Sequence, residues 1–127
     1  MLIVKGNVYT GRGPIPVEQL QEGDLLVDRG HRARRLLKIE RQLTARTMTF
    51  ARNKAVVLSA DAILLTAYGE RAVAAGNVRQ ADALHMVLPN YRVVQDRIVL
   101  LDDAAEGYLL TVENGENIFV DDYCIKL

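Results

Sequence analysis

Short segments separated by Gly, Pro and Asp make up residues 10–28, and this stretch limits the fold more than any other part of the sequence. A strand is predicted to end at Thr10, with a turn over residues 11–14. A short amphipathic segment follows at residues 17–20, then a tight turn at residues 22–24 and an apolar strand at residues 25–27. Gly-Pro and Gly-Asp pairs favour turns that neither a long helix nor a long strand accepts. The stretch therefore indicates short strands joined by tight turns.

The same layout returns in a weaker form later in the chain, where residues 74–84 align with residues 16–26. Asp24 in the first copy and Asp82 in the second both precede apolar residues, although Ala81 replaces Gly23. Hydrogen bonds from turn backbone to side chain explain both Asp residues more simply than an acid-base pair. A duplicated unit predicts a pseudo-symmetric fold, in which each half buries surface that the other cannot bury alone.

Short strand-like segments continue through the chain, with turn residues every eight to twelve positions, and long helical periodicity is missing. The predicted strands are 2–4, 8–10, 25–27, 35–39, 55–58, 63–66, 84–88, 91–94, 98–101, 108–112, 117–120 and 123–125, with a loop at 102–107. Rough alternation at Leu43, Thr47, Thr49 and Ala51 favours strands there as well. Residues 29–31 are predicted to be a hairpin turn. Many short strands of this kind are typical of an all-β fold, and 127 residues suit a single domain covering 1–127.

Charge is balanced over the whole chain but unevenly distributed. The net charge is zero, so no field of the whole molecule attracts nucleic acid or membrane. Residues 29–54 contain nine Arg or Lys and one acid, Glu40, whereas residues 102–122 contain seven acids and no base. The basic stretch is interpreted first as a solvated strand face, whose charge the acidic C-terminal third compensates.

Neither secretion nor membrane insertion is indicated. The single Cys124 cannot form an internal disulfide, and it is interpreted as a buried, inert thiol. The N-terminal apolar run is too short for a signal peptide, and no segment reaches the roughly 20 apolar residues of a membrane span. We therefore expect a protein of the cytoplasm or of a larger assembly. His31 and His85 lack neighbouring metal-ligand patterns, so no metal and no cofactor are expected.

Three stretches resemble the Hint module, the self-processing domain shared by inteins, hedgehog C-terminal domains and bacterial intein-like proteins. Residues 6–27 are similar to its first block, residues 58–66 to the block that carries Thr-x-x-His, and residues 108–127 to its closing blocks. The resemblance implies an all-β, Hint-type horseshoe of short antiparallel strands with internal pseudo-twofold symmetry. It also implies that both termini meet in the centre, with residues 2–4 and 123–125 in neighbouring strands.

The chain departs from this family where the chemistry takes place. The resemblance places the opening nucleophile at Leu2, the block-two hydroxyl at Ser59 and the His that protonates the departing nitrogen at Ala62. It places the assisting His at Glu116, and the closing His-Asn pair at Lys126 and Leu127. No catalytic residue is therefore expected, because the reactant of each step is missing. Met1 alone precedes Leu2, so we also expect no flanking polypeptide to be joined.

The leading functional hypothesis is a catalytically inactive Hint-like domain that acts as a structural or protein-interaction module, not as an enzyme. The partner would be another protein of unknown identity, and the oligomeric state is left open. One alternative is residual autoproteolytic or peptide-binding activity in the Hint cleft. Another is electrostatic binding of nucleic acid, which has little support because aromatic residues hardly interleave the basic ones. The candidate docking patch of the basic stretch consists of Arg32, Arg34, Arg35, Lys38 and Arg41.

Overall fold

The computed structural model describes residues 1–66, 69–72, 83–87 and 92–127. Within these residues it contains fifteen β-strands and one turn of 3-10 helix, η1 (Val17–Gln19). The strands of the first half are β1 (Ile3–Lys5), β2 (Asn7–Thr10), β3 (Gly13–Pro16), β4 (Leu25–Val27), β5 (Ala33–Thr44), β6 (Thr47–Phe50) and β7 (Val57–Ser59). Those of the second half are β8 (Ile63–Thr66), β9 (Gly69–Ala72), β10 (Ala83–Val87), β11 (Arg92–Asp96), β12 (Ile98–Leu101), β13 (Ala105–Val112), β14 (Asn117–Val120) and β15 (Tyr123–Lys126). No described helix is long and apolar enough to cross a membrane.

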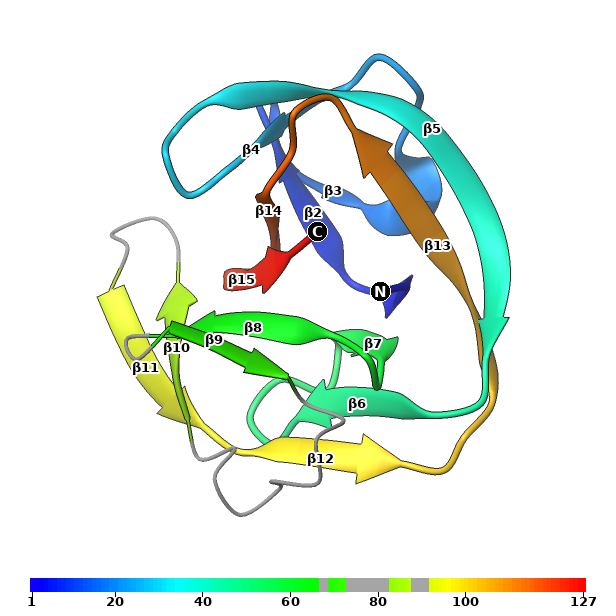
Figure 1. Ribbon diagram of the computed structural model, residues 1–127, viewed down its shortest axis with the longest axis vertical. Helices are drawn as coiled ribbons and strands as arrows, with labels where there is room; N and C mark the ends of the chain where they lie inside the picture. The colour runs from blue at the N-terminus through cyan, green and yellow to red at the C-terminus, as the bar shows by residue number, and fades with distance from the viewer. Residues whose placement is uncertain (67–68, 73–82, 88–91) are drawn as a thin grey trace.

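The strands pair antiparallel and curl into a horseshoe-shaped ring (Figure 1). Hydrogen-bonded neighbours follow the order β11-β10-β8-β15-β14-β2-β4-β5-β13-β1-β7-β6-β12, with β3 added to β2 and β9 added to β8. The first and last strands of this order, β11 and β12, are consecutive in the chain, and only Arg97 separates them. The all-β horseshoe that the sequence predicts is confirmed.

Strand pairing obeys an internal twofold symmetry. β2 pairs with β3 and β4, and β8 pairs in the same way with β9 and β10. The long strand β5 then pairs with β13 from the second half, whereas β12 pairs with β6 from the first. The symmetry also relates β14 to β15 and β1 to β7. When every strand is replaced by its symmetry equivalent, hydrogen-bonded neighbours remain neighbours. The two halves therefore exchange strands, and neither forms a closed sheet alone.

The register of the repeat differs from the one that the sequence alignment predicts. The Thr10 hydroxyl donates to Gly13 O at 2.8 Å, and Thr66 repeats this bond to Gly69 O at 2.8 Å. Thr10 pairs with Leu26, and Thr66 pairs with His85, so Leu26 corresponds to His85 and not to the predicted Leu84. The predicted alignment is therefore wrong in register, and a one-residue slip exchanges the two faces of a strand. Residues 74–82 of the second copy lie outside the described residues.

β3 occupies part of the predicted turn. Only Gly11 and Arg12 form the turn, and Gly13–Pro16 pairs with β2. Proline cannot donate to a ladder, and β3 tolerates Pro14 and Pro16 because it is paired on one side only among the described strands. The prediction of a turn as far as Pro14 is therefore wrong.

The segment after β3 agrees with its predicted amphipathic pattern. Val17 and Leu20 are buried, whereas Glu18 and Gln19 are exposed. In the turn that follows, Gly23 has a φ of +93° and donates its N–H to Leu36 O at 2.7 Å. The segment from Val17 to Gly23 is thus organised as the sequence indicates.

The long strand β5 joins what the sequence predicts as separate pieces. It pairs with β4 through its first three residues and with β13 through most of the others. The register shifts beside Leu36, and Leu37, the residue passed over by the shift, is 47% exposed. β13 begins at Ala105, inside the predicted loop, because its first residues pair with the far end of β5.

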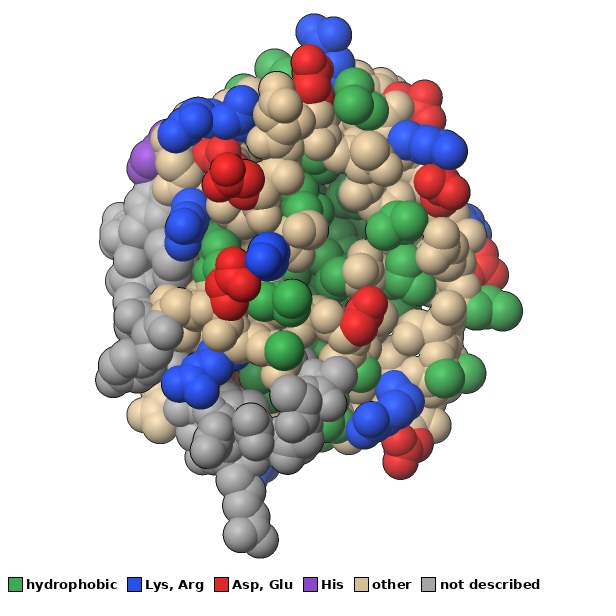
Figure 2. Space-filling view, viewed as in Figure 1, with side chains coloured by type: hydrophobic (Ala, Val, Ile, Leu, Met, Phe, Trp, Pro, Cys, Tyr) green, Lys and Arg blue, Asp and Glu red, His purple; other side chains and the backbone are tan. Residues whose placement is uncertain are grey.

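The core fills the ring, and both chain ends lie inside it (Figure 1). Figure 2 shows hydrophobic side chains at the hollowed centre of this face, with charged side chains mostly toward its edge. β1 pairs with β13 and β7, whereas β15 pairs with β14, β8 and β10. The prediction that the two terminal strands are neighbours is therefore wrong. Gly107 permits this position of β1, because a Cβ there would lie 2.8 Å from Leu2 Cβ.

Candidate functional site

The Ser59 hydroxyl lies against the first peptide bond of the chain. Ser59 ends β7, which pairs with β1 and so brings this side chain to the N-terminus. Its Oγ accepts the Leu2 N–H at 2.6 Å, and its own N–H donates to Leu2 O at 2.9 Å. Both residues are buried. The structure thus brings together Leu2 and Ser59, two positions that the sequence places far apart and the family resemblance singles out.

Asp61 completes this polar group. Ser59 donates its hydroxyl proton to Asp61 Oδ1, and Asp61 Oδ2 lies 3.4 Å from the N-terminal amine of Met1. Burial acts to raise the pKa of Asp61, but the hydrogen bond from Ser59 and the charge of the amine outweigh it, so the pKa lies below its ordinary value of 3.8. The carboxylate is stabilised in its ionised form and is therefore a weak base.

Two further predicted site positions, Leu2 and Ala62, carry hydrocarbon side chains. Leu2 is 6% exposed, and Ala62 is fully buried with its N–H bonded to Ser59 O at 3.1 Å. The polar group can therefore hold the Met1–Leu2 amide by its N–H, but no neighbouring side chain at Leu2 or Ala62 can attack its carbonyl or protonate its nitrogen.

The predicted C-terminal positions line a separate hollow of about 300 Å³. Glu116, Lys126 and Leu127 lie here together with Arg29 and Glu70. Lys126 Nζ pairs with Glu70 Oε2 at 3.0 Å, and the Leu127 N–H donates to Glu116 O at 3.0 Å. Leu127 is 36% exposed, so its side chain remains partly open to solvent. The hollow contains charged groups of both signs, and Leu127, at the position of the closing Asn, has no side-chain amide.

Comparison with solved structures finds inteins and an intein-like domain. The gp41-1 intein is 18% identical over 99% of this chain and 98% of its own, with a TM-score of 0.79. The Msm DnaB1 intein splicing domain bound with zinc is 16% identical over 100% of both chains, with a TM-score of 0.69. A bacterial intein-like domain from Clostridium thermocellum is 15% identical over 99% of this chain and 98% of its own, with a TM-score of 0.67. No protein-family model and no curated protein matches the sequence.

This chain has the Hint fold of inteins. At these identities the likeness concerns the fold alone, so it assigns no role to an individual residue. Asp61, the partner of Ser59, is not among the predicted site residues, although the Ser-x-Asp spacing is visible in the sequence. Arg29 and Glu70 are missing from the prediction too, because only the folded Hint domain brings them beside Lys126.

Cys124 has no access to the surface of the domain. It is 1% exposed, and its Sγ lies 3.6 Å from Asn117 Oδ1. Burial raises the pKa of the thiol to about 12, so the nucleophilic thiolate is absent near neutral pH. Cys124 is therefore buried, as the sequence interpretation expects.

The predicted basic docking patch is largely neutralised within the domain. Arg34 pairs with Asp28, Lys38 with Glu40, and Arg41 with Glu106 at 2.7 Å. Two acids of the C-terminal third thus form ion pairs with the basic stretch, Glu106 with Arg41 and Asp102 with Arg46. Arg32 and Arg35 form no ion pair with any described residue.

The loop between β4 and β5 is held by Asp28. Its Oδ1 accepts the N–H groups of Gly30 and Arg32 at 2.8 and 3.0 Å, and His31 adopts a φ of +60°. The predicted hairpin turn at residues 29–31 is confirmed. No cluster of three or more potential metal ligands occurs among the described residues, and the side chain of His85 lies outside them.

Proposed function

We propose that this protein is a catalytically inactive intein-like domain that serves as a structural or protein-interaction module. The observation that carries the proposal is the environment of the Met1–Leu2 peptide. Ser59 Oγ holds its N–H at 2.6 Å, but hydrocarbon side chains occupy Leu2 and Ala62. An acyl shift requires a thiol or hydroxyl at the first position and an acid near the departing nitrogen. Neither group is present at these positions.

Ser59 does not replace the missing nucleophile. Its oxygen faces the amide hydrogen, whereas attack requires an approach to the carbonyl carbon. Its proton is directed to Asp61, whose lowered pKa makes that carboxylate a poor proton acceptor. This geometry disfavours residual autoproteolysis at the N-terminal end.

The C-terminal end also lacks the reacting group. Cyclisation of an Asn requires a side-chain amide, and Leu127 has none. Lys126, at the preceding position, is engaged with Glu70. Neither end therefore contains the residue that would begin its own step.

Exposed leucines support the choice of a protein partner. Among the described residues, four large hydrophobic side chains are exposed, and three of them lie on β4 and β5: Leu25, Leu37 and Leu43. Leu43 is 80% exposed. β4 pairs with β5, so the three leucines lie along one pair of strands, with Leu25 and Leu37 toward one end of β5 and Leu43 toward the other. The ion pairs along β5 leave less free charge for nucleic acid than the sequence suggests.

Intact-mass spectrometry tests the absence of activity. The protein is incubated for a day with dithiothreitol or hydroxylamine, and we expect its mass to stay unchanged. A protease-inhibited sample without nucleophile is the control. A shortened species that forms only with the nucleophile would contradict the proposal.

Restoring the missing groups tests the reason for inactivity. A tag is fused before residue 1, and Leu2→Cys is combined with Ala62→His. A second arm uses Met1→Cys with Ala62→His, because the Met1 amine also lies within 3.4 Å of Asp61. We expect thiol-dependent release of the tag from one of the double variants and not from the parent protein. Release from the parent would show that these positions are not the cause.

Site-specific photocrosslinking tests the interaction role. A photoreactive residue replaces Leu43 in the cell that makes the protein, and the exposed neighbour Gln42 is the matched control position. We expect a discrete protein adduct from position 43 that is much weaker from position 42. Equal labelling of many proteins at both positions would argue against a specific partner.

A further inference from the structure

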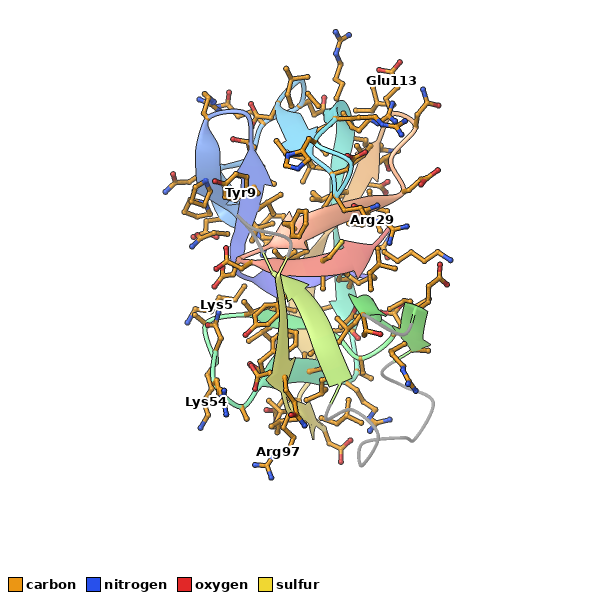
Figure 3. The ribbon with its side chains drawn as sticks, turned by 90° about the vertical axis from the view of Figure 1, so that its left-hand side faces the viewer. Lys5, Tyr9, Arg29, Lys54, Arg97 and Glu113 are labelled. Atoms are coloured by element: carbon orange, nitrogen blue, oxygen red, sulfur yellow. The ribbon has the colours of Figure 1, made fainter. Side chains whose placement is uncertain are left out.

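Two surface hollows occupy equivalent positions in the pseudo-symmetric ring. The first, here called the arginine hollow, has a volume of about 370 Å³ and is lined by Ala51, Arg52, Gln95, Asp96 and Arg97. The second, here called the glutamate hollow, has a volume of about 250 Å³ and is lined by Leu25, Ala33, Arg34, Arg35, Glu113 and Asn114. Figure 3 places Arg97 and Glu113 at opposite ends of the molecule, as a twofold relation requires.

Matching backbone hydrogen bonds establish the equivalence. The Ala51 N–H donates to Arg97 O at 2.8 Å, and the Glu113 N–H donates to Arg35 O at 2.9 Å. The two donors are separated along the chain by the same interval as the two acceptors. Arg97 therefore corresponds to Arg35, and Ala51 corresponds to Glu113. The two hollows share a backbone frame and differ in their side chains.

The arginine hollow contains cations that the described protein does not neutralise. The Asp96 carboxylate is 5% exposed, and it accepts the backbone N–H groups of Arg52 and Arg97 at 3.3 and 2.8 Å. Its second oxygen accepts the Tyr123 hydroxyl at 3.0 Å. These bonds fix the two backbone positions but do not use the guanidinium groups. Both Arg side chains are exposed, and neither forms an ion pair with a described residue.

A third cation increases the positive potential at this end. Lys54 follows Arg52 in the same turn, is exposed and has no ion-pair partner among the described residues. Figure 3 shows Lys54 and Arg97 at the same end of the molecule. Arg52 and Arg97 line the same hollow, and Lys54 lies two residues from Arg52 in the chain.

The glutamate hollow differs in its ion pairs and not in the charge of its lining, because two Arg and one acid line each hollow. Arg34 Nε pairs with Asp28 Oδ2 at 3.5 Å, and Glu113 contributes a carboxylate where the arginine hollow has Ala51. Asn114 takes the place of Arg52. The same frame thus supplies an internal comparison in which Arg34 is paired with Asp28, while Arg35 lines the same hollow as the Glu113 carboxylate.

We propose that the arginine hollow is a binding site for a phosphate group. Guanidinium groups match the oxygens of a phosphate with paired, charge-assisted hydrogen bonds, and two of them can bind the two sides of one anion. The volume suffices for a phosphate with a small substituent. The phosphate belongs either to a small free compound or to the backbone of a nucleic acid, and both share the chemistry that the hollow recognises.

Calorimetric titration with pyrophosphate at low ionic strength tests the site, and a short single-stranded oligonucleotide forms the second arm. We expect saturable binding that weakens about tenfold in Arg52→Gln and in Arg97→Gln, because each loses a charge-assisted bond. Arg35→Gln is the matched control, since Arg35 holds the equivalent position beside Glu113, and its affinity should stay within about twofold of the parent value. Tighter binding of the oligonucleotide than of pyrophosphate would identify nucleic acid as the source, and the reverse would identify a small phosphate compound.

A second pair of variants tests the site without removing an arginine, by changing which hollow contains a glutamate. Ala51→Glu introduces into the arginine hollow the carboxylate that the other hollow contains, and it should abolish pyrophosphate binding while the circular-dichroism spectrum is unchanged. Glu113→Ala should leave binding at the arginine hollow unaffected. No saturable binding of either probe, or equal weakening by Arg35→Gln and Arg97→Gln, would overturn the proposal.

Discussion

At the scale of single residues, Ser59 has a structural role that needs no reaction. The Leu2 N–H is buried, and a buried amide without an acceptor costs free energy comparable to a lost hydrogen bond. Ser59 Oγ supplies that acceptor and donates its own proton to Asp61. The hydroxyl therefore closes β1 onto β7 in addition to the bonds of the strand ladder.

Replacing Ser59 should destabilise the domain. Ser59→Ala leaves the buried Leu2 N–H without its acceptor, and we expect a loss of about 1–3 kcal/mol in the free energy of unfolding. Denaturant titration measures this loss. Ser59→Thr retains the hydroxyl and serves as the control, with a smaller loss expected. An unchanged midpoint in Ser59→Ala would mean that water satisfies Leu2 equally well.

Asp61 should give the stability of the domain a dependence on acid. Its folded-state pKa is lowered, so its contribution is fully present above the ordinary value of 3.8 and is lost as pH falls through the folded value. We expect parent protein and Asp61→Asn to differ in melting temperature by a constant amount from about pH 5 to 7. The difference should shrink progressively below pH 3.8. A difference that grows toward low pH would reverse the sign of this argument.

At the scale of elements, turn chemistry determines where strands begin and end. Gly23 adopts a φ of +93° and has no neighbouring atom within 4 Å of the place where a Cβ would lie. Steric crowding therefore cannot explain a requirement for glycine there, and backbone conformation can. Gly11 has equally open surroundings without a positive φ.

This pair of glycines gives a matched comparison. Gly23→Ala should destabilise the domain by about 1–2 kcal/mol, because an L side chain disfavours the left-handed region. Gly11→Ala should be nearly neutral, since it meets neither strain nor a clash. Thermal melts of the two variants check the prediction. Equal losses would show that positive φ is not what Gly23 provides.

Much of the element pattern could be predicted from sequence because turns are local. Alternating apolar residues and Gly-rich turns predict the position of most strands, including β4, β8 and β14. The prediction failed at β3, where prolines are tolerated at an edge, and at β5, whose length depends on pairing with β13 from the other half of the chain. A pairing partner so distant in sequence leaves no local signal.

At the scale of the whole molecule, the exchange of strands between halves makes one cooperative unit. Leu36 on β5 and Ile98 on β12 each follow one of the equivalent residues Arg35 and Arg97, and both are buried in the same core cluster. Leu36 pairs with Val112 of the second half, and Ile98 pairs with Phe50 of the first. Damage to either half therefore reaches the other through these pairs.

Unfolding should reflect this single unit. Leu36→Ala and Ile98→Ala should each cost about 2–5 kcal/mol by leaving a cavity in the core. Both should lower one sharp transition, with far-ultraviolet circular dichroism and near-ultraviolet tyrosine signals coinciding. Two separated transitions in either variant would show that the halves fold independently.

The candidate site could be predicted only in part for the same reason. The family resemblance points to Leu2 and Ser59, and the ring brings them into contact. It points equally to Lys126 and Leu127, yet these line a different hollow, because β15 pairs with β8 and β14 and not with β1. The ion pairs that neutralise the basic stretch depend on rotamers and register that composition does not contain.

The closure of the ring by distant strands has a consequence for how the protein is made. A ribosome delivers the chain in order, and β1 leaves the exit tunnel long before its partner β13 exists. Most of β5 likewise lacks its pairing partner until β13 has been made. A nascent chain therefore exposes Leu2, Ile3 and Leu36 until β13 has been synthesised, and slow translation before that point prolongs the exposure. Chaperones that act on emerging chains would meet this domain at its N-terminal strand first.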